Sequence, residues 1–189
     1  GLAGVNVYYA QKLLDWTVKF TTAINELVQT YDDHFSSELN NAKQHTGQKE
    51  IARMMRDFLH DSKRTRKRAE HLYKGQHNET VFKEKVQEYY SLRCVPQILG
   101  AVYDTIAHTE RIVEEELNSA NDNPIVDVPT QQVYHGGNFH GDYISLEMDK
   151  LKLVVTRMTM LAERQLNYLL NPKINELLPP FVNAGKLGF

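Results

Sequence analysis

Apolar side chains recur at helical spacing in four stretches of the chain. The first covers residues 5–31 and contains neither glycine nor proline, and the second covers residues 48–59. The third begins at Pro96 or Gln97 and runs to residue 117; a proline suits the first helical turn, where its missing N–H would have no partner. The fourth covers residues 142–170 and stops before Asn171-Pro172. We therefore predict four helices, of which the first and last are long.

The apolar positions indicate which helix faces are buried. Gln165 takes an in-register position in the fourth helix and interrupts its apolar stripe near the end. The stripes are wide, and the fourth helix has apolar residues on more than one face, so we expect the helices to associate with other copies of the chain. The alternative is that one chain covers every apolar face itself. On the first helix the expected buried face comprises Leu13, Trp16, Phe20, Ile24, Leu27, Val28 and Tyr31.

The remaining segments carry weaker patterns. Residues 60–80 are polar, and we interpret them as a loop with a basic helical turn. No stretch alternates strictly between apolar and polar residues for four cycles, so strands are at most marginal. These features predict an all-α, long-helix bundle, with residues 1–189 forming a single helical region.

A turn-rich loop covers residues 118–141, between the third and fourth helices. It contains Asn-Asp-Asn-Pro at 121–124 and paired glycines at 136–137. Short amide and carboxylate side chains before proline favour tight turns, and glycine permits a close backbone approach. A loop of this length inside a helical protein is usually functional or highly ordered, so we treat residues 118–141 as a candidate active-site loop.

Composition excludes several classes of protein. The chain has 41% hydrophobic and 24% charged residues and a formal net charge of -2, which argues against nucleic acid as its main partner. We interpret the basic run at residues 63–68 as a solvated face rather than a phosphate site. Cys94 is the only cysteine, so no internal disulfide is possible. With no signal peptide and no apolar run long enough to span a bilayer, we expect a cytoplasmic protein without a membrane partner.

A first candidate site precedes the third helix. Gln87, Tyr90 and Arg93 place an amide, a phenol and a guanidinium close together in the sequence. Arg93 can hold a carboxylate through two parallel N–H bonds, which lysine cannot reproduce. The alternative is a structural ion pair between Arg93 and Glu88.

A second candidate is the glycine-flanked Phe139. An aromatic ring on such a loop can form the wall of a pocket for a planar ligand, although it can equally be a buried anchor for the loop. His135 and His140 lie nearby, but no carboxylate stands at metal-ligand spacing, so we expect no metal.

Several motifs occur together and in order. Residues 90–94 read Tyr-Ser-Leu-Arg-Cys, 122–124 read Asp-Asn-Pro, and 136–141 read Gly-Gly-Asn-Phe-His-Gly. His-Thr-Gly-Gln at 45–48 and Leu-Pro-Pro-Phe at 178–181 add to the set. With these motifs the whole chain closely resembles the histidine, tyrosine and phenylalanine ammonia-lyases, and within them the histidine/tyrosine branch.

The resemblance implies a fold, a reaction and roles for residues. The chain would be the central helical region of the fumarase/aspartase-like fold, in a homotetramer whose active sites each draw residues from three subunits. The reaction would remove ammonia from an aromatic amino acid, giving urocanate from histidine or coumarate from tyrosine. Arg93 would bind the substrate carboxylate, and Tyr90, the candidate catalytic residue, would hydrogen-bond with Gln87 around the substrate and the electrophile. Phe139 would pack beside both.

One departure from the family pattern limits this expectation. The family's electrophile, methylidene-imidazolone, forms from an internal Ala-Ser-Gly, which does not occur in the chain. We therefore expect the chain to be an internal fragment, inactive by itself, with other catalytic residues before Gly1 and after Phe189. An aminomutase of the same family and a non-catalytic helical assembly module are the alternatives. The choice among histidine, tyrosine and phenylalanine stays open.

Overall fold

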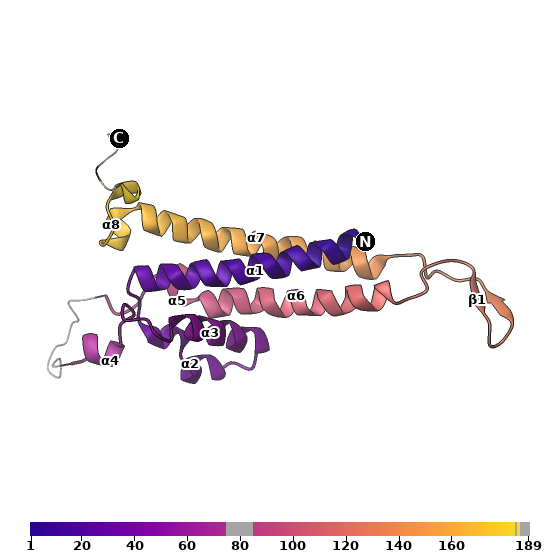
Figure 1. The fold of residues 1–189 in the computed structure, drawn as a ribbon, viewed down its shortest axis with the longest axis horizontal. Coiled ribbons are helices and arrows are strands. Elements are labelled where there is room, and N and C mark those ends of the chain that lie inside the picture. Colours follow the sequence, from indigo (N-terminus) through magenta and orange to yellow (C-terminus); the bar gives the residue numbers. More distant parts are fainter. Residues whose placement is uncertain (75–84, 184, 186–189) are drawn as a thin grey trace.

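Three long helices lie side by side and form the body of the molecule (Figure 1). The computed structural model describes residues 1–74, 85–183 and 185. Helix α6 (Val95–Leu117) runs in the opposite direction to α1 (Leu2–Leu27) and α7 (Asp142–Leu170), and it contacts both. The prediction of an all-α, long-helix bundle is confirmed, and the fourth helix has the bounds expected of it.

Short elements surround the three long helices. They comprise η1 (Asp32–Phe35), α2 (Ser37–Asn41), α3 (Thr46–Leu59), α4 (Arg68–His71), α5 (Tyr90–Arg93), α8 (Pro172–Asn175) and η2 (Pro180–Val182). Helix α4 supplies the basic turn expected within residues 60–80, of which 75–80 lie outside the described residues. A small antiparallel hairpin of β1 (Ile125–Asp127) and β2 (Gln132–Tyr134) projects from the loop between α6 and α7.

The first helix ends earlier than its apolar pattern predicted. Helix α1 stops at Leu27 rather than near residue 31, because Gln29 adopts a positive φ of 57° that no α-helix continues through. Beyond it, Tyr31 pairs with Arg66 in a parallel β-bridge. The chain thereby turns away from the bundle and leads into η1 and α2.

The core contains α3 because two glycines allow it to approach α6 closely. A Cβ atom on Gly47 would lie 2.1 Å from the Gly100 carbonyl oxygen, and one on Gly100 would lie 2.5 Å from the Gln48 amide nitrogen. The Gly47 N–H donates to the Asp104 carboxylate at 2.8 Å. This crossing fixes α3 against the first half of α6.

The buried face of α1 differs from the predicted one. Trp16 and Phe20 are 56% and 62% exposed, and their rings stack with centroids 5.7 Å apart. Leu13 and Leu27 are exposed as well. The prediction was wrong for these four residues, although Val28 and Tyr31 are buried as expected. The reason is that α1 has apolar residues on two faces, and the bundle buries the one with smaller side chains, which allow closer helix packing. That face comprises Val7, Ala10, Leu14, Val18, Thr21, Thr22 and Asn25.

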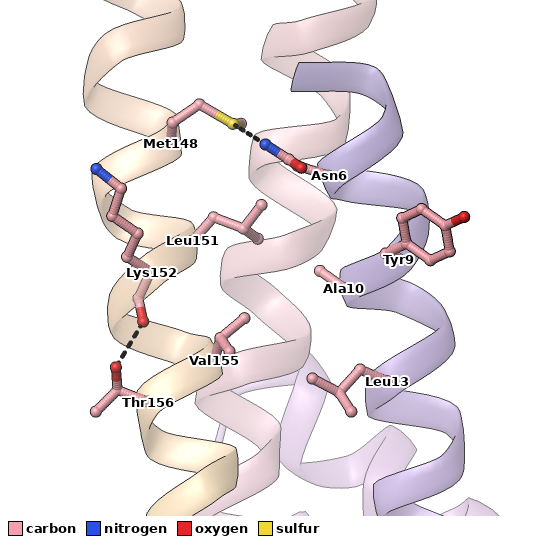
Figure 2. A pocket seen from close by; sticks show the side chains of 9 residues that line it. All are labelled: Asn6, Tyr9, Ala10, Leu13, Met148, Leu151, Lys152, Val155 and Thr156. Atoms are coloured by element: carbon pink, nitrogen blue, oxygen red, sulfur yellow. Dashed lines mark hydrogen bonds between the residues drawn. The ribbon is translucent and has the colours of Figure 1, made fainter. Parts of the chain in front are cut away.

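Helix α7 also leaves apolar side chains uncovered. Its exposed residues include Leu153 at 69% and Met160 at 51%. Figure 2 shows the groove between α1 and α7, a cavity of about 490 Å³ lined largely by apolar side chains such as Leu13, Leu151 and Val155. The alternative that one chain covers every apolar face is therefore wrong for these described residues.

Candidate functional site

The segment of residues 86–93 carries the first group of candidate residues. Its last four form α5, a single helical turn separated from α6 by Cys94, whose backbone (φ -98°, ψ 17°) departs from helical geometry. Leu92 is fully buried and belongs to a small cluster with Val28 and Tyr168. An isolated turn of four residues is not stable in water, so contacts with the bundle must hold α5 in place.

Two buried side chains bond to the backbone of this segment. Gln165 donates its Nε2–H to the Ser91 carbonyl oxygen at 2.8 Å. Arg68 donates to the Val86 carbonyl oxygen and, through Nε and Nη2, to both carboxylate oxygens of Asp33 at 2.7 and 3.2 Å. The Arg68 side chain is only 14% exposed, so the interpretation of the whole basic run as a solvated face was wrong for this residue.

Arg93 is a half-buried residue whose guanidinium lies against the Tyr90 ring. Its Cζ lies 4.8 Å from the centroid of the Tyr90 ring. Within the described residues its Nε has no hydrogen-bond partner, and no carboxylate, Glu88 included, forms an ion pair with it. The alternative of a structural ion pair with Glu88 is therefore wrong, and Arg93 retains the donors that a carboxylate requires.

The neighbours of Arg93 divide into exposed and buried groups. Gln87 is exposed and Tyr90 is 71% exposed, so both can reach a ligand. Burial raises the pKa of the Glu88 carboxyl. Burial also raises the pKa of Tyr168 to about 12, and the charge of Glu88 acts in the same direction. Tyr90 and Tyr168 share a groove of about 390 Å³ between α5 and the end of α7.

His34 is a buried residue near this segment that sequence reasoning did not identify. It is 5% exposed, and its Nε2 lies 3.3 Å from Nη2 of Arg68. A guanidinium only donates, so Nε2 accepts and the ring proton of the neutral imidazole sits on Nδ1. Burial lowers the pKa of His34 to about 4; Asp33 opposes this shift, and the positive charges of Arg68 and Arg93 add to it. No local motif marks His34, because its partner Arg68 lies 34 residues away in the sequence.

The loop of residues 118–141 differs from the segment of residues 86–93, because its backbone is held by hydrogen bonds within the loop itself. Its backbone is held by Asn123, whose Oδ1 accepts from the Gly136 N–H at 2.8 Å, and by Asn138, whose Nδ2 donates to the Ala120 carbonyl at 3.3 Å. The sequence predicted tight turns from the short side chains before Pro124, and Asn123 forms a side-chain bond to the backbone of this loop. Phe139 is 61% exposed, so the alternative that it anchors the loop by burial is wrong.

The two groups of candidate residues lie at opposite ends of the bundle. Arg93 ends α5, directly before α6, whereas Phe139 follows the other end of α6 (Figure 1). Helix α6 has 23 residues, which corresponds to a length of about 34 Å. An amino acid bound by Arg93 therefore cannot contact Phe139 of the same chain.

The described residues contain neither a metal-binding cluster nor a membrane-spanning helix. No group of three or more His, Cys, Asp and Glu side chains there is arranged to hold a metal ion, and the pair His135 and His140 belongs to no such group. No helix in those parts of the chain combines the length and the apolar character needed to cross a membrane.

Comparisons with known proteins agree on one group of enzymes. A family model described as aromatic amino acid lyase matches residues 1–189. A tyrosine 2,3-aminomutase from Myxococcus sp. (strain Mx-B0) is 38% identical over 100% of this chain and 37% of that protein. A histidine ammonia-lyase from Bacillus cereus (strain AH187) is 34% identical over 95% of this chain and 33% of that protein.

A solved structure gives the same result. The phenylalanine aminomutase of Pantoea agglomerans has a TM-score of 0.90 and 33% identity over 98% of this chain and 37% of that one. The chain thus spans about a third of the length of these relatives.

Proposed function

The chain belongs to the aromatic amino acid lyase family, and from this premise we propose that it is part of an ammonia-lyase for an aromatic amino acid. The observation that carries the proposal is the guanidinium of Arg93, which is half-buried beside the Tyr90 ring and unpaired with any described carboxylate. A half-buried cation without a counter-ion favours an anionic ligand, and the carboxylate of an amino acid has the matching two-oxygen geometry.

Each candidate residue has a part in binding. Arg93 holds the substrate carboxylate, and Tyr90 and Gln87, both exposed, hydrogen-bond around the substrate. Phe139 forms a wall of the pocket for the aromatic ring. The methylidene-imidazolone of this family would supply an electrophile for the amino group of the substrate. The chain contains no Ala-Ser-Gly from which to form that group, so we expect the 189-residue chain to release no ammonia when assayed alone.

The substrate is proposed as histidine or tyrosine, with urocanate or coumarate as the product. The test follows product absorbance with the full-length protein on histidine, tyrosine and phenylalanine. Replacing Arg93 with Met should raise KM about 100-fold, because a charge-assisted pair of hydrogen bonds contributes up to about 3 kcal/mol. Arg93→Lys keeps the charge without the planar fork of donors, so its KM should lie between those of the native protein and Arg93→Met. A KM that stays native in Arg93→Met would refute the carboxylate role.

An aminomutase is the second candidate, because two of the relatives named above are aminomutases. An aminomutase returns the amino group to the neighbouring carbon and so yields a β-amino acid. Chromatography of the same reaction mixtures distinguishes the two activities. A β-amino acid as the main product would favour the aminomutase, and an unsaturated acid with free ammonia would favour the lyase.

Self-association follows from the geometry of a shared site. Arg93 and Phe139 lie at opposite ends of α6, so they can serve one substrate only if different copies of the chain supply them. The exposed apolar faces of α1 and α7 offer surfaces for this contact. We propose a homo-oligomer, with the tetramer implied by the family resemblance, acting in the cytoplasm.

A further inference from the structure

Gln165 is a polar residue in the middle of an apolar helix face. It lies on the buried side of α7, in the series Leu151, Val154, Met158, Leu161 and Tyr168, and it is only 3% exposed. Burying an amide without partners costs free energy, so a buried glutamine needs bonds at both ends of its amide. Gln165 has them on two different elements.

The Gln165 amide connects α1 to α5. Its Oε1 accepts from the Thr21 hydroxyl of α1 at 3.0 Å, and its Nε2 donates to the Ser91 carbonyl of α5 at 2.8 Å. Both ends of the Gln165 amide thereby have a hydrogen-bond partner. One side chain of α7 thus holds the short helix α5 against the long helix α1.

The bond from Gln165 satisfies a carbonyl oxygen of Ser91 that has no backbone partner in the described part of the chain. In a continuous helix it would accept from the backbone N–H four residues later. Helix α5 ends at Arg93, and among the described residues no backbone N–H donates to Ser91. The one other described side chain that bonds to a backbone oxygen of residues 86–93 is Arg68, at Val86.

The bond lies in the segment that carries the substrate residues. Ser91 follows Tyr90 and is two residues before Arg93, in the same helical turn. A shift of this turn would move the phenol and the guanidinium together, and small displacements of a binding group lower the rate of an enzyme strongly. We propose that Gln165 is a positioning residue, which fixes α5 so that Tyr90 and Arg93 meet the substrate in the correct geometry. The catalytic part of this proposal rests on the proposed function.

The test compares Gln165→Met with the matched control Thr21→Val in the full-length protein. The methionine has a similar volume and removes both bonds, whereas Thr21→Val removes one bond of the same amide and leaves Ser91 bonded. Hydrogen exchange of the 90–98 peptide should become about tenfold faster in Gln165→Met, because one buried hydrogen bond is lost, and stay near native in Thr21→Val. Equal exchange in the two variants would overturn the proposal, whether or not the protein is a lyase.

Kinetics supply the second measurement. The KM of Gln165→Met for the amino acid should rise about fivefold to tenfold, and Thr21→Val should keep the native KM. The KM of Gln165→Glu should approach the native value at acid pH, where the protonated carboxyl can donate to Ser91. The KM should rise with pH, because the ionised carboxylate cannot donate this bond. A lower Tm with unchanged KM in all three variants would mean that Gln165 only stabilises the fold. An inactive native protein would refute the proposed function and leave the exchange result to decide the position of α5.

Discussion

At one end of the bundle, side chains of α4 and α7 form hydrogen bonds to the backbone of residues 86–93, whereas at the other end the loop of residues 118–141 is almost entirely exposed. In the first region, hydrogen bonds within one chain hold the backbone in place. The second holds its backbone by local bonds such as that between Asn123 and Gly136, and its Phe139 ring has no cover. The difference supports the proposal that Arg93 is a preorganised carboxylate ligand and that a neighbouring copy completes the pocket wall around Phe139.

The largest expected effect is a difference in stability when the same substitution is made at one glycine in the packed bundle and one in the exposed loop. A Cβ at Gly100 would meet the backbone of Gln48 at 2.5 Å, whereas one at Gly137 would meet nothing within 4 Å. We expect Gly100→Ala to lower the free energy of unfolding by about 3 kcal/mol through overpacking. Gly137→Ala should change it by less than about 0.5 kcal/mol. Thermal and urea unfolding of the two variants measure this, and equal losses would contradict the account of the α3–α6 crossing.

The second prediction concerns pH and the buried His34. Its pKa falls from an ordinary 6.5 to about 4 on folding, so the unfolded chain binds the proton between these values and the folded chain does not. Stability should therefore decline as the pH falls from 6.5 to 4, by at most about 3 kcal/mol for this residue. In His34→Gln, the free energy of unfolding should fall less over this pH range. The matched control, His140→Gln on the exposed loop, should follow the native curve, and a native curve for His34→Gln would exclude the role of His34.

The smallest of these effects concerns the exposed face of α1. Phe20 is 62% exposed and stacks on Trp16, and covering one such ring contributes about 2 kcal/mol. Phe20→Lys should shift the chain towards monomer in light scattering at micromolar concentration. Thr130→Lys, on the exposed hairpin turn, is the control and should leave the mass unchanged. A monomeric native chain, or an unchanged mass in Phe20→Lys, would count against association through this face.

The sequence predicted the long elements well and their surroundings less well. The bounds of α7 follow from its apolar period and from Asn171-Pro172, and its interruption at Gln165 was visible in the same pattern. The buried face of α1 was mispredicted because two apolar faces give one helical period, and periodicity does not say which face meets the bundle. The early end of α1 depends on the positive φ of Gln29, for which the sequence has no glycine signal.

The candidate site shows the same limit. The sequence predicted from its motif that Arg93 binds a carboxylate, but the absence of an ion pair with Glu88 is a property of three-dimensional packing. Arg68 looked like part of a solvated run, because a charge pattern says nothing of partners such as Asp33, far away in the sequence. The distance between Arg93 and Phe139 could be estimated only once both were placed at the ends of one helix.

The most direct test of the shared site mixes two impaired variants of the full-length protein and assays them at a substrate concentration far below the native KM. Arg93→Met removes the carboxylate ligand, and Phe139→Asp places a negative charge in the pocket wall. Each variant alone should have little activity. If the two residues of one site come from different copies, an equal mixture reassembled from subunits should recover about a quarter of the native activity, because that share of sites receives both native residues. Activity no higher than the sum of the two variants would contradict this account and place both residues in the same copy.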